Sequence, residues 1–137
     1  MSKEVCLWCH SSGSEALEAI ECAGERALVH PSHRGALESY CRDADSAKWR
    51  FLGGIGASIL LGVGGQLLLV MLTSKMAGAL VLAVAATVAA VTILRYPFAT
   101  PETLALVGVR RSIRLARVCG YLILVIGVAL AGYGLTL

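Results

Sequence analysis

The stretch Phe51–Thr73 reads FLGGIGASILLGVGGQLLLVMLT and holds no charged residue over 23 positions. As an α-helix it would be about 34 Å long, at 1.5 Å per residue, which is enough to cross the hydrocarbon core of a bilayer. Two further uncharged runs follow, over residues 76–94 and 118–137. Because backbone groups in lipid have no water to bond, each run is predicted to be a transmembrane helix.

The composition of the whole chain agrees with this interpretation. Of 137 residues, 57% are hydrophobic and 15% are charged, against about 25% charged residues in a typical soluble domain. This apolar surplus excludes an ordinary soluble globule and a disordered chain. The sequence therefore predicts a mainly α membrane protein with two domains: a polar N-terminal module over residues 1–47 and a membrane domain over residues 48–137.

The positive charges predict the orientation in the membrane, because Lys and Arg gather on the cytoplasmic side. One side would hold seven of them and the other only Lys75. The seven are Lys48, Arg50, Arg95, Arg110, Arg111, Arg114 and Arg117. We therefore expect a multi-pass protein of the inner or plasma membrane, with its N-terminus in the cytoplasm and Leu137 outside.

Residues 101–117 link the second and third membrane helices and are predicted to form a short amphipathic helix of their own. Thr100 is a typical capping residue and Pro101 suits the first helical position. Four arginines gather near the end of this segment, at 110, 111, 114 and 117. Arg110, Arg111, Arg114 and Arg117 favour a helix that lies on the membrane surface, and the alternative is that they only fix the topology.

Small residues recur on one face of each predicted membrane helix. Such faces let two helix backbones approach closely, and a glutamine among them can add an interhelical hydrogen bond. We therefore expect tight packing of these helices on each other or on further copies of the chain. The residues concerned are Gly54, Ser58, Gly62 and Gln66 in the first helix, Ala79, Ala83 and Thr87 in the second, and Gly120, Gly127 and Gly134 in the third.

The N-terminal module carries two pairs of metal-ligand residues at matching spacing. Cys6 and Cys9 form a C-x2-C pair, and His30 and His33 form an H-x2-H pair twenty residues later. Two thiolates and two imidazoles are a typical closed, tetrahedral ligand set for structural Zn²⁺. A segment of this size also has too little core to fold well alone, so a bound metal would stabilise it.

The order of elements in residues 5–45 resembles a treble-clef zinc finger. A Cys knuckle is followed by a possible hairpin, 16–22 and 26–29 with a turn at 23–25, and by a helix over Pro31–Ala44. The resemblance implies zinc ligation by Cys6, Cys9, His30 and His33, and it names a scaffold without an activity. His10 stands where treble clefs often have glycine. Residues 14–20 also suit a capped helix.

Three residues are alternatives to the predicted zinc ligands, namely His10, Cys22 and Cys41. We assign Cys22 and Cys41 to packing, because a lone cysteine usually behaves as a small buried hydrophobe. The odd cysteine count of five and the predicted cytoplasmic location argue against a disulfide framework.

These observations favour a non-enzymatic role, since no catalytic motif stands out and a closed zinc site has no open position for water. The first hypothesis is a membrane anchor or adaptor, or an assembly subunit of a larger complex, with a cytoplasmic protein partner. The alternative is a homo-oligomeric channel or membrane-disrupting effector gated by the zinc module. The expected partners are the lipid bilayer and further protein chains, and nucleic acid is not expected.

Overall fold

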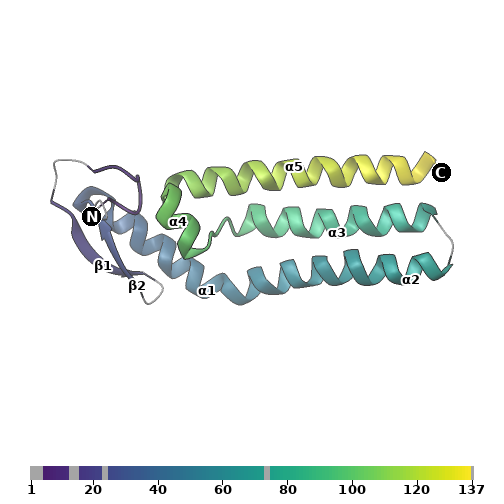
Figure 1. Cartoon of the computed structure of the whole chain (residues 1–137), viewed down its shortest axis with the longest axis horizontal. Helices are drawn as coiled ribbons and strands as arrows, with labels where there is room; N and C mark the ends of the chain where they lie inside the picture. Colours follow the sequence, from purple (N-terminus) through teal and green to yellow (C-terminus); the bar gives the residue numbers. More distant parts are fainter. Residues whose placement is uncertain (1–4, 13–15, 23–24, 73–74, 137) are drawn as a thin grey trace. The chain divides into compact units, whose positions relative to one another are not determined.

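The computed structural model describes residues 5–12, 16–22, 25–72 and 75–136. The chain forms two compact units, one of residues 1–48 and 97–116 and the other of residues 49–96 and 117–137. Two long helices, α1 (Arg34–Ile59) and α5 (Val109–Thr136), contribute residues to both units (Figure 1). We call the first of these the N-terminal unit and the second the membrane unit.

The first regular element of the N-terminal unit is an antiparallel hairpin of β1 (Glu18–Cys22) and β2 (Glu25–Val29). It follows Cys6 and Cys9 in the chain. Ile20 pairs with Ala27 and both side chains are buried, whereas the neighbours of Ile20 are exposed. This alternation is the period of a strand, so the predicted hairpin is confirmed. The alternative helix over 14–20 is wrong for residues 16–20, and residues 14 and 15 lie outside the described residues. The predicted turn includes Ala23 and Gly24, which lie outside the described residues.

The helix that follows the hairpin is longer than the sequence predicted. A 3-10 turn, η1 (Pro31–His33), leads directly into α1, which passes Ala44 and continues to Ile59. Residues 45–50 are mostly polar but contain neither glycine nor proline, so the change in composition does not interrupt the helix. Beyond Ile59 the chain stays helical through a π-helical turn, η2 (Leu60–Gly64), and α2 (Gly65–Leu72).

The structure corrects the prediction of one surface helix over residues 101–117. Helix α4 (Pro101–Val107) ends before Gly108, whose φ of 77° is outside the helical region, and α5 begins at the next residue. The cap at Thr100 is as predicted, since its side-chain oxygen accepts a hydrogen bond from the Thr103 amide at 3.5 Å. The segment 97–116 belongs to the N-terminal unit, whereas we expected it in the membrane domain.

The core of the N-terminal unit explains why this segment joins it. Leu104 of α4 and Val109 of α5 are buried in the same apolar cluster as Leu37 of α1. Leu104 and Val109 therefore face protein, whereas Leu106 and Leu115 of the same segment are exposed. The buried members of the cluster are Cys6, Ile20, Ala27, Val29, Leu37, Tyr40, Cys41, Leu104 and Val109.

The membrane unit is built of long apolar helices, among them α3 (Lys75–Arg95). The described chain has three helical segments long and apolar enough to cross a membrane, Pro31–Leu68, Met76–Arg95 and Val109–Thr136. Large apolar side chains are exposed along them, for example Leu60, Val125 and Leu135. The fold is thus mainly α with three candidate membrane helices and a small α+β unit. Thr73 and Ser74, which lie where the first predicted membrane helix ends, are outside the described residues, and so is Leu137.

The small residues of the first helical run face α3. A β-carbon at Gly54 would collide with the side chain of Thr92, and one at Gly62 would lie 3.6 Å from Ala85 Cβ. Gln66 Nε2 donates a 2.7 Å hydrogen bond to the Gly78 carbonyl oxygen of α3. The amide therefore satisfies a backbone group inside the bundle, as its position in the stripe suggested.

The glycines of α5 also face α3. A β-carbon at Gly120 would lie 2.8 Å from Leu94 Cγ, and one at Gly127 would lie 3.3 Å from Thr87 Oγ1. Gly134 would meet Ala79 Cβ at 3.2 Å. The stripes of α1 and α5 therefore pack on α3 within one chain.

Candidate metal centre

The four predicted ligands come from three neighbouring pieces of backbone. Cys6 and Cys9 lie in the turn before the hairpin, His30 directly follows β2, and His33 ends η1. The Leu7 amide donates to the Leu28 carbonyl oxygen at 2.8 Å, which ties the Cys turn to β2. Backbone pairing thus brings the C-x2-C and H-x2-H motifs together across the sequence gap.

The turn over residues 6–10, here called the knuckle, closes through its own backbone. The His10 amide donates to the Cys6 carbonyl oxygen at 2.8 Å, and the Cys6 amide donates to the Ser11 carbonyl oxygen at 3.2 Å. His10 has φ 58°, in the left-handed region that favours glycine. This is the position where treble clefs often have glycine, so His10 takes the glycine conformation at a small conformational cost.

The ligand atoms of Cys6, Cys9, His30 and His33 all lie within 4.8 Å of one another. Cys6 Sγ is 3.9 Å from His33 Nδ1, and Cys9 Sγ is 3.6 Å from His30 Nδ1. In a tetrahedral zinc site with ordinary Zn–S and Zn–N bond lengths, a sulfur and a nitrogen ligand lie about 3.6 Å apart. The cluster therefore has the dimensions of a four-coordinate site.

Hydrogen bonds favour the thiolate form of Cys6. The side chain is fully buried, and this burial is the largest influence and raises its pKa. Amides of Cys9, His30 and Trp8 and the His33 ring together outweigh burial and lower the pKa of Cys6 from 9.0 to about 6. The His30 amide lies 3.5 Å from Cys6 Sγ. A thiolate is the form that binds a metal.

The surroundings of His30 also fit a metal ligand. Its side chain is buried, and Nε2 has no hydrogen-bond partner among the described residues. Its other ring nitrogen, Nδ1, lies beside Cys9 Sγ. A metal held between Nδ1 and Cys9 Sγ would bind Nδ1, and the ring proton would then be on Nε2. Sulfur and imidazole donors in a closed set suit Zn²⁺ better than Mg²⁺ or Ca²⁺, which prefer oxygen.

The knuckle also holds the first turn of α5. The amides of Val109 and Arg110 donate to the carbonyl oxygens of Leu7 and Trp8, at 2.9 and 3.1 Å. Amides in the first turn of a helix have no partner within the helix, so the knuckle satisfies two of them. A β-carbon at Gly108 would lie 3.0 Å from His10 Cβ, which together with its positive φ requires glycine here. Sequence reasoning missed this contact, although Gly108 signals a break between two helical patterns.

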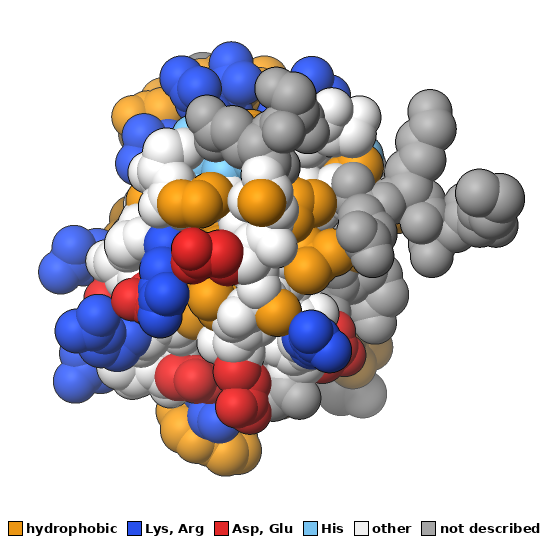
Figure 2. Space-filling model, turned by 90° about the vertical axis from the view of Figure 1, so that its left-hand side faces the viewer, with side chains coloured by type: hydrophobic (Ala, Val, Ile, Leu, Met, Phe, Trp, Pro, Cys, Tyr) orange, Lys and Arg blue, Asp and Glu red, His pale blue; other side chains and the backbone are white. Residues whose placement is uncertain are grey.

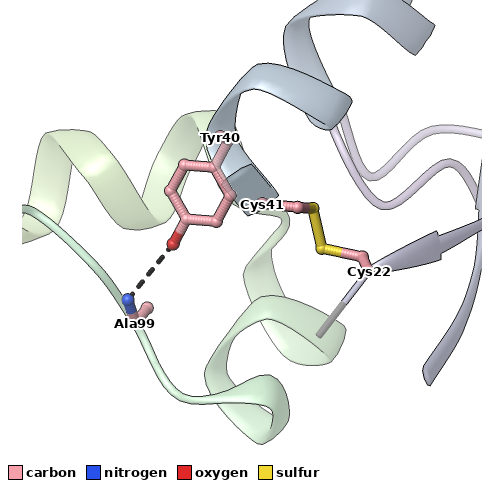
Figure 3. Close-up of a disulfide and its surroundings, with 4 residues drawn as sticks. All are labelled: Cys22, Tyr40, Cys41 and Ala99. Carbon is pink, nitrogen blue, oxygen red and sulfur yellow. Dashed lines mark hydrogen bonds between the residues drawn. A yellow bond between two sulfur atoms is a disulfide. The ribbon is translucent and has the colours of Figure 1, made fainter. Parts of the chain in front are cut away.

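Two of the alternative ligands have another role. Cys22, at the end of β1, and Cys41, in α1, form a disulfide with their Cα atoms 5.5 Å apart (Figure 3). Our assignment of both to packing, and our argument against a disulfide, are therefore wrong. Pairing depends on how β1 packs on α1, which local spacing does not encode. His10 is not part of the cluster of ligand atoms.

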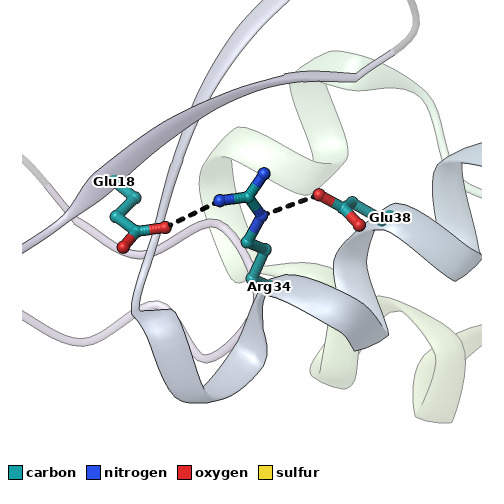
Figure 4. Close-up of polar contacts among 3 residues, drawn as sticks. All are labelled: Glu18, Arg34 and Glu38. Atoms are coloured by element: carbon teal, nitrogen blue, oxygen red, sulfur yellow. Dashed lines mark hydrogen bonds and ion pairs between the residues drawn. The ribbon is translucent and has the colours of Figure 1, made fainter.

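Further contacts secure α1 in the N-terminal unit. The Ala99 amide donates to the Tyr40 hydroxyl at 3.2 Å (Figure 3), and burial raises the pKa of Tyr40 more than this contact lowers it. Arg34 bridges Glu18 of β1 and Glu38 of α1, at 3.2 and 2.8 Å (Figure 4). Both ion pairs are exposed and contribute little stability, and only the pair with Glu18 joins the hairpin to α1.

The predicted membrane-surface residues Arg110, Arg111, Arg114 and Arg117 all lie on α5, and their side chains are exposed. None of them belongs to the metal cluster.

No protein-family model matches the chain, and no curated protein or solved structure matches it.

Proposed function

We propose that the chain is a non-enzymatic membrane adaptor or assembly subunit whose N-terminal unit is held together by a structural Zn²⁺ ion. The observation that carries this proposal is the closed set of two thiolates and two imidazoles. Such a set leaves no coordination position for water or substrate, so the metal would stabilise the fold. The stabilised unit would then present its surface to a protein partner.

The membrane helices support the role of an anchor. Three segments have the length and hydropathy of membrane spans. The runs over residues 51–73, 76–94 and 118–137 carry no Asp, Glu, His, Lys or Arg of the kind that transporters use. The spans would keep the zinc-bearing unit at the membrane, where its partner or the rest of a complex lies.

The alternative of a homo-oligomeric channel has less support. It was motivated by Gln66 and by the small-residue stripes. Within one chain, the side-chain amide of Gln66 donates a hydrogen bond to Gly78. Gly54 faces Thr92, and Gly120 faces Leu94. The features that suggested a pore thus have a sufficient role in packing a single chain. Ion flux through liposomes that contain the purified protein would revive the channel hypothesis.

The test compares metal content with the size of the membrane complex. Full-length protein and its Cys9→Ser variant are extracted in mild detergent from native membranes, with Cys119→Ser as the matched control. We expect about one zinc per chain and a complex larger than the monomer for wild type and control. Cys9→Ser should lose the metal and the complex but remain in the membrane, because insertion depends on apolar length. A metal-free wild type, or a wild type recovered only as a monomer, contradicts the proposal.

A further inference from the structure

The exposed arginines of α5 form one continuous face, here called the basic arc and made of Arg110, Arg111, Arg114 and Arg117. At about 100° per residue they fall within roughly a third of the helix circumference. Val109 and Ser112, on the other side of the same turns, are buried. One side of the first turns of α5 is therefore buried, while the arginines lie on the opposite side of the helix.

The basic arc has no acidic partner among the described side chains. The ion pairs in that part of the chain join Arg34 to Glu18 and Glu38. Elsewhere, acidic and basic side chains are mixed, as on the face in Figure 2. Four adjacent guanidinium groups repel one another in water, so an external anion would stabilise the arrangement. Guanidinium groups match phosphate particularly well, because they can donate two parallel hydrogen bonds.

The position of the basic arc along α5 indicates which anion is within reach. The uncharged run begins at Val118, one residue after Arg117. The helix rise puts Arg117 and Arg114 within about 6 Å of that boundary, which is the depth of a headgroup layer. Arg110 and Arg111 lie about 10–12 Å from it, just above the headgroups. Leu115 and Val118 beside them are exposed and suit contact with acyl chains.

The first turn of α5 is fixed before any ligand arrives. Its amides at 109 and 110 are bonded to the knuckle, and Ser112 donates its amide to the Gly108 carbonyl oxygen at 3.0 Å. A held helix loses little backbone freedom on binding, which favours affinity. We propose that the basic arc binds the phosphate groups of anionic phospholipids, with Arg114 and Arg117 as direct contacts and Arg110 and Arg111 attracting the lipid at longer range. This site is independent of the adaptor role.

Native mass spectrometry of the full-length protein in detergent tests the proposal. The protein is titrated with phosphatidylglycerol and, separately, with phosphatidylcholine of the same acyl chains. We expect clear preference for phosphatidylglycerol, and about a fivefold loss of that preference for each direct contact removed, or roughly 30-fold in Arg114→Gln/Arg117→Gln. Arg110→Gln/Arg111→Gln should lose less at physiological salt, where the Debye length is about 8 Å.

The matched control is Arg26→Gln/Arg42→Gln, which removes the same charge from exposed positions of the N-terminal unit and should keep the preference. Arg114→Lys/Arg117→Lys should retain part of it, because lysine keeps the charge but not the planar fork. Because the protein is in detergent and not in a bilayer, the measured lipid preference does not depend on its orientation in a membrane. Equal affinity of wild type for the two lipids would mean that the arginines serve topology alone, and unchanged preference in the Gln variant would also overturn the proposal.

Discussion

At the scale of single residues, Cys6 would make the proposed metal binding sensitive to acid. Hydrogen bonds lower the pKa of its thiol from 9.0 to about 6, so the folded chain favours the thiolate. This contribution to stability is fully present above about pH 9 and is lost as the pH falls through about 6. We predict that zinc affinity, measured with a competing chelator, weakens steeply below about pH 6, as protons compete for the ligands. Affinity that stays constant down to about pH 5 contradicts the ligand assignment.

The disulfide is predicted to stabilise the N-terminal unit without contributing to the metal site. Cys22 and Cys41 are 19 residues apart, and closing a loop of this length constrains the unfolded chain by about 3 kcal/mol. Cys22→Ser and Cys41→Ser should therefore lower the stability of the unit by about that amount and keep the zinc. Thermal unfolding and elemental analysis measure the two effects. Loss of zinc in either variant would show that the cysteine is a ligand.

The difference between these two cysteine pairs shows what the sequence could predict. The four proposed ligands lie in short motifs with metal-ligand spacing, so the cluster that brings Cys6 and His30 together was predicted without knowing the fold. Cys22 and Cys41 have no such local pattern, because their distance depends on the packing of β1 against α1. His10 lies between these cases: its place after the knuckle was recognised, and its positive φ shows that the position keeps its conformation without glycine.

At the scale of elements, Gly108 is predicted to be essential for joining α5 to the knuckle. An alanine there would adopt a conformation that costs about 1–3 kcal/mol and would crowd His10. Gly108→Ala should therefore weaken the hydrogen bonds of the Val109 and Arg110 amides, and hydrogen exchange at these amides should become faster. Gly35→Ala is the control, because a β-carbon there meets nothing within 4 Å. Equal exchange rates in the two variants would contradict this role.

The packing of α1 on α3 gives a second prediction from two neighbouring residues. A β-carbon at Gly54 would collide with Thr92, whereas one at Gly53 meets nothing within 4 Å. We expect Gly54→Val to destabilise the membrane unit by about 1–3 kcal/mol, as overpacking does, and Gly53→Val to have a much smaller effect. Unfolding of the purified protein in detergent, followed by circular dichroism, compares the two. A similar loss in both variants would mean that α3 does not pack at Gly54.

The element boundaries were predicted well where apolar length decides them and poorly where polar residues continue a helix. The run over 76–94 corresponds closely to α3 (Lys75–Arg95), whereas the run over 118–137 lies in α5, which already begins at Val109 because the polar residues before 118 continue the helix. The helix over Pro31–Ala44 was predicted to end too early, since nothing in residues 45–50 breaks it. The segment 101–117 was predicted as one surface helix, because its apolar positions suit lipid and protein equally well and only the fold shows that Leu104 is buried in a core.

At the scale of the whole molecule, the predicted orientation can be tested with reporter fusions. Alkaline phosphatase folds only where disulfides form, so it is active outside the cytoplasm. Fusions after Ser74 and after Leu137 should be active, and a fusion after Ala99 should be inactive, because seven basic residues favour the cytoplasmic side against one. The reversed pattern would place the N-terminal unit outside.

The same orientation makes a prediction about the disulfide. A cytoplasmic Cys22–Cys41 pair is exposed to a glutathione pool that keeps most thiols reduced. The bond should therefore be partly reduced in growing cells and should form after an oxidant is added, while Cys6 and Cys9 stay protected by the metal. Alkylation of acid-quenched cells, followed by mass spectrometry of the two cysteine pairs, measures both. A fully oxidised Cys22–Cys41 pair before any oxidant is added would contradict a cytoplasmic N-terminal unit, because only an oxidising compartment maintains such a bond.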